Sequence, residues 1–511
     1  MPDAGAGLAD AFASLAVEPP SSSRPSTNTG QSRSNGAVDS EEGREHALAP
    51  WMEGLKRRKD DTRHPLALLD EELDAFVTWT RPTNAEHQLR LLAFRCFQTL
   101  VKAVWPSATC ELFGSMATGL YLPDGDFDVV IFDSRLMATP SVSLLRTLRD
   151  VLLRAGFAQP SDVRLVENAK VPLVKFRSTR KFGSFDFDVS FNSPKGPMGA
   201  RESLRLLEEL ERKEAGNRQR ARMMILLLKV LLAHAGLNEV RYGGLGGLSI
   251  FCMGVSDTFP SSLLGKTALD VLSFFTKYAR TFDYRNHTIT TANGGGIIQK
   301  SDWLPRTEAK RAQLSIVHPV DPQRDLSSGS YEWDAIHELL FASTRTLLAY
   351  ALGRGDLARP DPTRSALADA GIVVSPSMLE RRRSNEQLIA SGELKTLAET
   401  WDPVSLGLVP TAQYASPAQL AYQHNQRFGF GTYYLTPSTP FYPHAPTPYY
   451  YAQSTYHYAA QRQATNTASP SSHPGASART LSQQGAELQA HSQASPPLAY
   501  LNNTIEFRST P

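Results

Sequence analysis

Cysteine, net charge and long apolar segments are all scarce in this sequence, and each shortage excludes a class of protein. The three cysteines, Cys96, Cys110 and Cys252, lie far apart along the chain. This excludes a disulfide framework or a cysteine-rich zinc site and suits a reducing compartment. The formal net charge is only +2, so any contact with nucleic acid has to come from local basic patches.

Signals for secretion and membrane insertion are missing as well. The first residues, MPDAGAGLADAFASLAVEPP, lack the basic segment and the long apolar core of a signal peptide. The longest apolar run, residues 223–237, is too short for a membrane span and is interrupted by Lys229, which indicates a buried helix. We therefore expect a soluble intracellular protein that does not associate with a membrane.

Composition divides the 511 residues into four parts, of which two are expected to be folded domains. Residues 1–47 are rich in Ser, Pro, Gly and Ala and are expected to be disordered. Residues 48–192 mix helical spacing with short β-branched segments, which predicts a small mixed sheet with helices. Residues 193–390 are mostly helical in spacing, and residues 391–511 are expected to be a low-complexity tail.

The expected tail is poor in charge and rich in Ser, Pro and Gln, and it holds 11 of the 17 tyrosines. Such a segment cannot bury a core, but spaced tyrosines can make weak multivalent contacts. An assembly role and a tail without a specific partner both remain open.

Apolar spacing predicts individual elements in the two central parts. Strands are expected at 108–115, 126–132, 163–168, 171–177 and 185–191. Helices are expected at 69–80, 84–105, 143–156, 201–237, 243–256, 264–284 and 330–353, with 371–389 closing the second domain.

Acidic residues in two of the expected strands form the most informative pattern. Asp126 and Asp128 lie one residue apart, and residues i and i+2 of a strand point to the same side. Two adjacent carboxylates repel each other, so they need a cation unless they face open water. If the strand with Asp188 lies alongside, three carboxylates converge and can hold two divalent ions about 3.5–4 Å apart. From the residues alone, Asp186 competes for the third position.

Phosphate-binding residues are expected around this cluster. Gly114 and Ser115 predict a turn whose backbone N–H groups face a triphosphate. Lys229 on a helix of the second domain would reach the β and γ phosphates, although a lone lysine in an apolar helix is more often an edge residue. The pattern indicates attack of a 3′-hydroxyl on an α-phosphate, with Asp188 accepting the proton or assisting a metal.

The spacing Gly-Ser, Asp-x-Asp and a distant Asp resembles the DNA polymerase β-like nucleotidyltransferases. A closer resemblance is to their DNA polymerase sigma branch, which contains the nuclear poly(A) polymerase subunit of the TRAMP exosome-cofactor complex. It covers roughly residues 49–390 and neither tail. The segments that carry it, in order, are APW (49–51), VWPSA (104–108), FGSMATGLYLPDGDFDVVIF (113–132), AKVPLVKF (169–176), DVSFN (188–192), LNEVRYGGLG (237–246), FFTKYARTFDY (274–284) and HPVDPQRD (318–325).

The resemblance implies an α+β fold with a polymerase β-like nucleotidyltransferase domain and a mostly helical central, PAP-associated domain. The active site is then expected in the cleft between them. Asp126, Asp128 and Asp188 are implied to bind Mg²⁺ or Mn²⁺ and to carry catalysis, and the motif DVSFN favours Asp188 over Asp186.

The activity implied by the resemblance is template-independent addition of AMP from ATP to RNA 3′ ends, marking nuclear RNAs for processing or degradation by the exosome. The implied partners are a zinc-knuckle RNA-binding protein, an RNA helicase and the nuclear exosome. No RNP-type motif for direct RNA recognition is found in the sequence, in agreement with borrowed RNA binding. The implied location is the nucleus, with the nucleolus as an alternative.

Two departures from the family affect the nucleotide site. The family loop GGIGSYS reads GGLGGLS here, so Gly247 and Leu248 replace a phosphate-binding serine and a base-stacking aromatic ring, whereas Ser249 remains. The family segment NDVGRSSY reads RDLSSGSY, so Arg324 replaces an asparagine near the base and Tyr331 is kept. Loss of a stacking ring costs roughly 1–3 kcal/mol of base binding. Weaker or altered nucleotide preference is our working hypothesis.

Three other readings remain. A uridylyl- or mixed-nucleotide transferase on the same fold differs only in the base-contact loop, and a DNA polymerase would share the cleft chemistry. A catalytically weak scaffold of an RNA-processing complex would have no reason to keep three repelling carboxylates. Basic stretches at 56–59, 177–181 and 380–384 either contact an RNA backbone or are solvated surface, and the first is also a weak candidate nuclear import signal.

Overall fold

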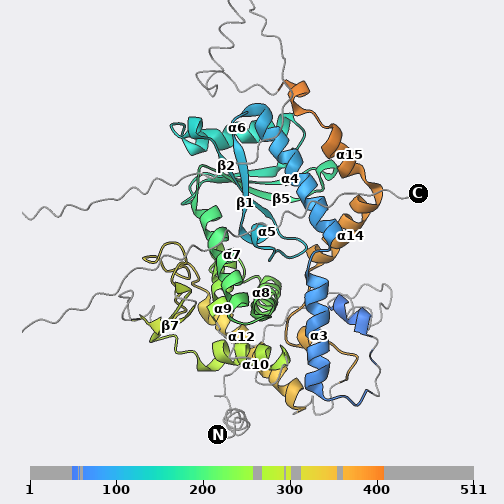
Figure 1. The fold of residues 1–511 in the computed structure, drawn as a ribbon, viewed down its shortest axis with the longest axis vertical. Coiled ribbons are helices and arrows are strands. Elements are labelled where there is room, and N and C mark those ends of the chain that lie inside the picture. The colour runs from blue at the N-terminus through green and yellow to red at the C-terminus, as the bar shows by residue number, and fades with distance from the viewer. Residues whose placement is uncertain are drawn as a thin grey trace, which may run out of the picture. The chain divides into compact units, whose positions relative to one another are not determined.

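The computed structural model describes residues 49–55, 57, 61–256, 267–292, 295–300, 312–353 and 361–407 (Figure 1). The chain comprises two compact units, Met1–Gly431 and Thr432–Pro511, and all described residues belong to the first. The expected disordered segment 1–47 and the tail beyond residue 407 therefore lie outside the described residues, as does most of the basic stretch 56–59.

A five-stranded mixed sheet carries the candidate site, in the order β1-β2-β5-β4-β3. Strands β2 and β5 run parallel, and the other neighbouring pairs are antiparallel. The strands are β1 (Thr109–Phe113), β2 (Phe127–Phe132), β3 (Ala158–Val166), β4 (Leu173–Ser178) and β5 (Asp186–Phe191).

One face of this sheet is an aromatic core. Phe127, Phe176 and Phe187 point from β2, β4 and β5 into this core, and the Phe127 and Phe187 rings stack with their centroids 4.5 Å apart. Helices α4 (Asn84–Val104) and α6 (Ser141–Arg154) pack on this side. Because side chains alternate along a strand, the residues next to these phenylalanines point to the opposite face, where the site lies.

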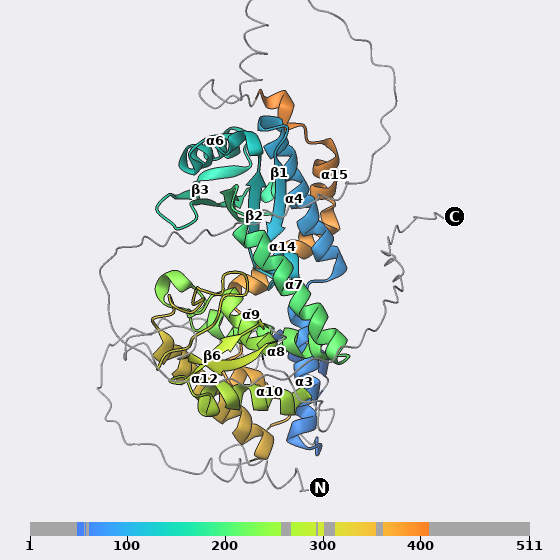
Figure 2. The same ribbon diagram turned by 60° about the vertical axis from the view of Figure 1, so that its left-hand side comes forward.

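A second hydrophobic cluster is almost entirely helical (Figure 2). At its centre lies α8 (Asn217–His234), whose run MMILLLKVLL is buried on nearly every side, as its uniform hydrophobicity predicts. The surrounding elements are α3 (Pro65–Thr80), α7 (Lys195–Lys213), α9 (Gly247–Ser256), α10 (Thr267–Thr276) with the π-helix Lys277–Thr281, the hairpin β6 (His287–Thr290)–β7 (Gly296–Gln299), α12 (Trp333–Leu352) and α13 (Ala366–Asp369).

The chain crosses between the two clusters more than once. Helix α3 packs in the helical cluster, whereas α4, which follows directly, packs on the sheet. Helix α14 (Pro376–Ser391) then returns to the sheet side, where Leu388 joins its cluster. A single division at residue 192 therefore does not separate the clusters, and the expected domain boundaries stay a prediction.

Residues 391–407 differ from the expected low-complexity tail. They form α15 (Glu393–Thr400) and a 3₁₀ helix (Pro403–Leu406). Leu394 is fully buried, and the Trp401 ring packs 4.7 Å from that of Phe182. This segment is folded because it carries an apolar stripe at helical spacing, formed by Leu394, Leu397 and Trp401.

The predicted α+β fold class is confirmed. The shorter elements are α5 (Gly114–Thr118) and 3₁₀ helices at Pro50–Leu55, Ser134–Leu136, Arg180–Phe182 and Val240–Tyr242. Among the described helices, none combines the length and the hydropathy that a membrane span requires.

Candidate active site

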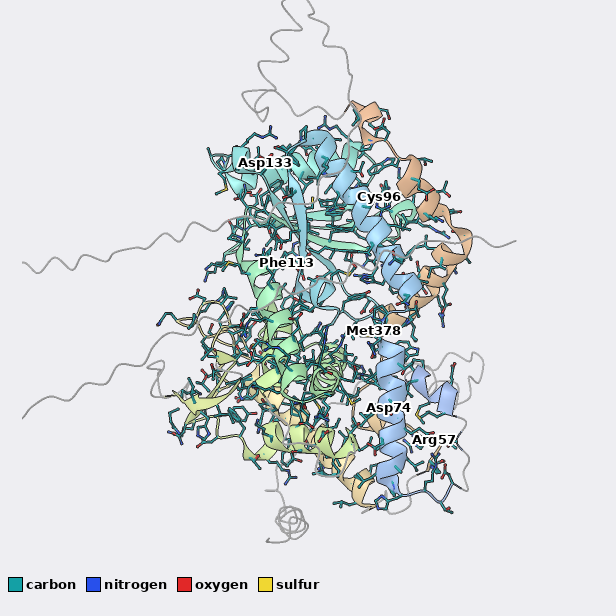
Figure 3. All side chains as sticks on the ribbon, in the orientation of Figure 1. Arg57, Asp74, Cys96, Phe113, Asp133 and Met378 are labelled. Atoms are coloured by element: carbon teal, nitrogen blue, oxygen red, sulfur yellow. The ribbon has the colours of Figure 1, made fainter. Side chains whose placement is uncertain are left out.

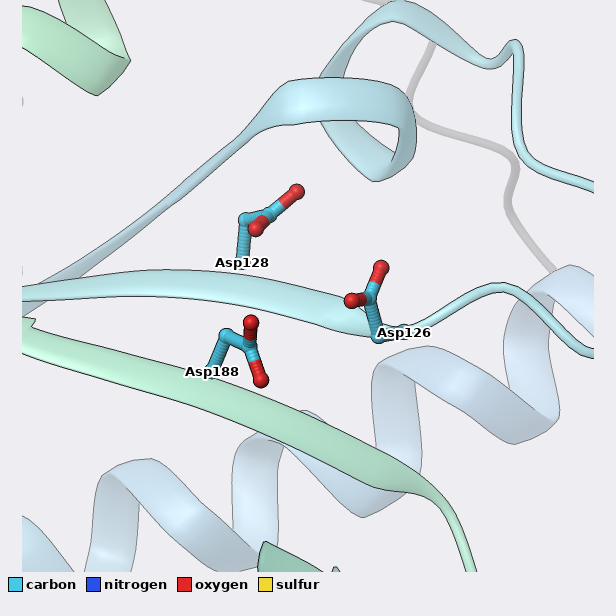
Figure 4. A group of neighbouring side chains, drawn as sticks. All are labelled: Asp126, Asp128 and Asp188. Carbon is cyan, nitrogen blue, oxygen red and sulfur yellow. The ribbon is translucent and has the colours of Figure 1, made fainter. Parts of the chain in front are cut away.

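Three aspartates meet at the edge where β2 and β5 begin (Figure 4). Asp128 and Asp188 are direct partners in the parallel β2–β5 pair, and Asp126 lies immediately before β2. One carboxylate oxygen from each aspartate lies within 4.8 Å of the others. Within the described ranges, no other group of three acidic, histidine or cysteine side chains has metal-binding geometry. Oxygen donors of this kind fit a hard divalent cation.

Two of the three carboxyl groups, those of Asp128 and Asp188, have raised pKa values. Burial raises the pKa of Asp128 well above its ordinary value, and the charges of Asp126 and Asp188 raise it further. Burial also raises the pKa of Asp188 to about 6, although a hydrogen bond from Lys175 acts in the opposite direction. The group therefore resists full ionisation unless a cation neutralises it.

Gly114 allows the backbone to approach Asp128 closely. Its φ is +60°, and a Cβ atom at this position would lie 2.0 Å from Asp128 Oδ2. A side chain would therefore displace the carboxylate. Instead of a simple turn, Gly114 starts the short helix α5, and Ser115 in its first turn faces the cleft described next.

A cleft of about 960 Å³ opens beside the aspartates. Its walls come from the sheet, from α5 and from α7, α8 and α9 of the helical cluster. Phe113 at the end of β1 and Met378 near the start of α14 both line it (Figure 3). A space of this size accommodates a nucleoside triphosphate.

Several of the expected nucleotide-binding residues reach this cleft. Gly114, Ser115, Lys229, Gly247 and Leu248 all line it. The Lys229 Nζ donates to the carbonyl oxygen of Leu120 at 2.8 Å. Burial lowers the pKa of this ammonium group, and the charges of the neighbouring aspartates Asp126 and Asp128 oppose that shift. The roles of these five cleft-lining residues in nucleotide binding stay predictions.

The other three expected residues are not among those that line the cleft. Ser249 is buried within α9. Arg324 is exposed, in a loop organised by the buried carboxylate of Asp325, which accepts the backbone N–H groups of residues 316 and 327. Tyr331 is 62% exposed, and its hydroxyl donates to the carbonyl oxygen of Arg241. A nucleotide contact by these three residues stays a prediction.

Lys175 is a site residue that the sequence analysis did not identify. It is the cross-strand partner of Asp188, and its Nζ donates to Asp188 Oδ2. The next outward pair on the same strands is Arg177 with Asp186, whose Nε and Oδ1 atoms are 2.8 Å apart. Asp186 thus has its own counter-ion and stands apart from the group of three. The signal was present, because VKFRS places basic residues at the same alternation as the acids of FDFDV.

Other cleft residues come from separate parts of the chain, and the sequence analysis did not single them out as site residues. Lys195 at the start of α7 forms an ion pair with Asp321 at 3.7 Å. His318 also lines the cleft, and its Nδ1 accepts backbone N–H groups of residues 320 and 321. Asp124 lines the cleft as well and accepts a hydrogen bond from Ser375 at 3.3 Å.

Comparison with known families follows the two structural regions. Residues 69–203 match the family of the central palm domain of mitochondrial-like poly(A) RNA polymerases, and residues 271–324 match the Cid1 family of poly A polymerases. Both matches agree with the resemblance to the DNA polymerase sigma branch of the polymerase β-like nucleotidyltransferases. The resemblance seen in the motifs is thereby confirmed.

Individual relatives of this chain agree with that resemblance. It is 30% identical to the poly(A) RNA polymerase CID14 of Cryptococcus neoformans over 55% of its own length and 36% of the relative's. It is 31% identical to Drosophila melanogaster Trf4-2, whose name describes an inactive poly(A) RNA polymerase, over 52% of this chain and 65% of that one. The chain thus spans less than two thirds of either relative.

The fold is shared with the polymerase core of TRAMP, an RNA surveillance complex. That structure superposes with a TM-score of 0.53 at 24% identity, covering 63% of this chain and 98% of the other. At this level of identity the similarity establishes the fold, and the chemistry has to be argued from the residues of this site.

Proposed function

We propose that this nucleotidyltransferase adds AMP from ATP to the 3′ end of RNA without a template. The observation that carries the proposal is the convergence of Asp126, Asp128 and Asp188 at the wall of a nucleotide-sized cleft. The names of the relatives, poly(A) RNA polymerases in several fungi, support adenylyl transfer. The inactive relative shows that similarity alone does not establish activity, so we base the proposal on the three carboxylates of this chain.

Each residue of the site has a defined task in this reaction. The three aspartates would hold Mg²⁺ or Mn²⁺, which supplies charge neutralisation for the attacking hydroxyl and the leaving pyrophosphate. The Asp188 carboxylate would accept the proton of the 3′-hydroxyl or assist a metal in doing so. Lys229 and the first residues of α5, Gly114 and Ser115, line the cleft and would bind the triphosphate.

A second candidate, a uridylyl- or mixed-nucleotide transferase, is favoured by one observation. Leu248 occupies the cleft wall where the family places a stacking aromatic ring. An aliphatic side chain discriminates poorly between bases, because it provides neither ring stacking nor a hydrogen-bonding edge. We therefore expect this enzyme to require a triphosphate but to discriminate only weakly among the four bases.

Extension of a labelled oligo(A) RNA by the purified full chain tests both candidates. ATP, UTP, GTP and CTP are supplied separately with Mg²⁺ or Mn²⁺, and an RNA ending in a 3′-deoxynucleotide is the control. Extension with ATP that the control RNA blocks is the expected result. Preferential extension with UTP would replace the adenylyltransferase assignment, and no extension with any nucleotide or metal would contradict nucleotidyl transfer by the isolated chain.

We further propose that the protein works in the nucleus with a zinc-knuckle RNA-binding protein and an RNA helicase, and that it supplies tailed RNA to the exosome. The support is the shared fold with the TRAMP polymerase core, described as part of an RNA surveillance complex. Immunoprecipitation of the tagged full chain from nuclear extract should recover these partners. Recovery of the chain without any of them from nuclear and cytoplasmic fractions would contradict this assembly.

A further inference from the structure

An arginine is buried directly beneath the metal-binding carboxylates. The side chain of Arg90, on α4, is 1% exposed. Its guanidinium carbon lies 4.6 Å from the ring centroid of Tyr121, 4.5 Å from that of Phe127 and 5.2 Å from that of Phe185. Three aromatic faces therefore enclose a positive charge in the core of the sheet domain.

The hydrogen bonds of Arg90 are directed at the backbone that carries Asp126. Its Nη2 donates to the carbonyl oxygen of Gly125 at 2.6 Å and to that of Asp126 at 3.3 Å. In the part of the chain that the structure describes, Nε and Nη1 have no hydrogen-bond partner. Burial lowers the pKa of Arg90 to about 10, with Tyr121 and Asp126 opposing the shift, so the group is charged at neutral pH.

Burial of an incompletely bonded charge is costly, usually by several kcal/mol. A hydrophobic side chain would fill the same aromatic cage without that cost. Unlike an apolar side chain, Arg90 holds two carbonyl groups at the start of β2 in place through hydrogen bonds. Those carbonyls belong to the residues that determine where the Asp126 carboxylate points.

A second arginine holds the corresponding position before β5. Arg381, on α14, donates from Nη1 to the carbonyl oxygen of Gly183 at 2.7 Å and from Nη2 to that of Ser184. Ser184 has a φ of +52°, a left-handed conformation that costs a non-glycine residue free energy. This turn leads directly into β5 and hence to Asp188.

Both arginines use the same aromatic ring. The guanidinium carbon of Arg381 lies 4.7 Å from the centroid of Phe185, the ring that Arg90 also contacts. Phe185 is 1% exposed and lies between the two turns, one residue before β5. The contacts of Arg90, Phe185 and Arg381 therefore connect the turn before β2 with the turn before β5.

We infer that Arg90 and Arg381 are positioning residues for the metal site, which fix Asp126 and Asp188 through the backbone turns preceding β2 and β5. The inference rests on the proposed function for the role of the metal. Neither arginine touches substrate, and the pair acts only through the carboxylates that it places. The competing reading is that the arginines merely stabilise the core.

The variants Arg90→Met and Arg381→Met distinguish these readings. Methionine keeps apolar volume in the cage while removing the charge and the donors, and replacing a buried charge by an apolar group is often neutral for stability. The affinity of the full chain for Mn²⁺ is measured by electron paramagnetic resonance, together with the melting temperature without metal. We expect Mn²⁺ affinity to fall about 10-fold, as for other residues that orient metal ligands. We also expect kcat to fall more than the KM for ATP changes.

Further variants sharpen the test. Arg90→Lys keeps the charge and should recover part of the affinity. The double variant should lose less than the product of the single losses, because the two residues share Phe185. Arg382→Met is the matched control: its guanidinium stacks on Trp79 at 4.9 Å and bonds Glu86, away from the aspartates. It should lower the melting temperature and leave Mn²⁺ affinity unchanged.

The outcomes separate this inference from the proposed function. Wild-type Mn²⁺ affinity in both methionine variants, with a lowered melting temperature, would show that the arginines only stabilise the core. If Arg90→Met does not fold, Arg381→Met on the half-buried face of α14 decides by the same criterion. Equal Mn²⁺ binding by wild type and Asp128→Asn would overturn the metal site, and this inference with it.

Discussion

At the scale of single residues, the site depends on close contacts that a chemically small change would break. At Gly114 a methyl group would collide with Asp128. At Gly247 there is space for a small side chain. Burial raises the pKa values of Asp128 and Asp188, and a bound cation would lower them. Three predictions belong to this scale.

Gly114→Ala is expected to abolish most activity. The added Cβ would lie 2.0 Å from Asp128 Oδ2, so the carboxylate has to move and we expect the extension rate to fall about 100-fold or more. Gly156→Ala is the control, because its φ of +61° is similar and the nearest atom to a Cβ, Lys181 Nζ, is 3.9 Å away. Equal rate losses in the two variants would mean that backbone strain rather than the contact with Asp128 is responsible.

Gly247→Ser is expected to strengthen ATP binding. A Cβ at this position meets only Lys229 Cε, at 3.9 Å, so the hydroxyl fits beside the lysine that we propose as a phosphate ligand. One added hydrogen bond of about 1 kcal/mol would lower the KM for ATP about 5-fold. Gly199→Ser, which adds the same side chain in open space elsewhere on the cleft wall, should leave this KM unchanged. An unchanged KM in Gly247→Ser would place the triphosphate elsewhere.

Asp188 gives a pH dependence with a defined sign. Its folded-state pKa of about 6 lies above the ordinary value of 3.8. The contribution of Asp188 to the free energy of unfolding is therefore fully present at low pH and is lost as the pH rises through about 6. Divalent cations bind the ionised form, and the rise in melting temperature caused by Mg²⁺ should therefore grow over the same interval. Asp188→Asn should flatten this growth, and an identical pH profile in that variant would contradict the assignment.

At the scale of elements, the helices near the end of the described chain support the sheet. Helix α14 crosses from the helical cluster to the sheet, and α15 covers the sheet core with Leu394 and Trp401. All residues that line the cleft fall between Phe113 and Met378. Residues 393–406 are thus important for the stability of the fold without taking part in the chemistry.

A chain that ends at Ser391 is expected to be less stable than one that ends at Gly407. Loss of the buried Leu394 and of the packed Trp401 removes about 1.5–3 kcal/mol for each side chain. Urea unfolding of the two chains measures the difference, and the longer one should retain the extension activity of the full chain. Equal unfolding midpoints would contradict the packing of α15 against the sheet.

At the scale of the whole molecule, the sequence predicted the fold class and the acidic cluster because both have strong local signals. Strands such as FDVVIF alternate and are β-branched, and helices such as 84–104 have unbroken apolar spacing. The third aspartate needed more than spacing. Asp186 and Asp188 share a strand face, and only the motif resemblance separated them, whereas the structure shows Asp186 paired with Arg177.

The remaining features depend on tertiary contacts. Lys175 had an alternation signal, but its pairing with Asp188 required the strand order to be known. Arg90 lies on the apolar face of its helix, yet the carbonyls that it bonds are 35 and 36 residues away in sequence. Residues 391–407 were assigned to the tail because a short amphipathic helix next to a low-complexity segment carries little signal of its own.

The most direct test of the account is RNA extension by Asp126→Ala/Asp128→Ala beside Asp186→Ala, with ATP and Mg²⁺. We predict that the double variant loses activity by about 10³-fold or more, since the metal would contribute several kcal/mol to the transition state. Asp186→Ala removes a carboxylate from the same face outside the group of three, and it should stay within a few fold of wild type. Persistent extension by the double variant would contradict the assignment of this site as the catalytic centre.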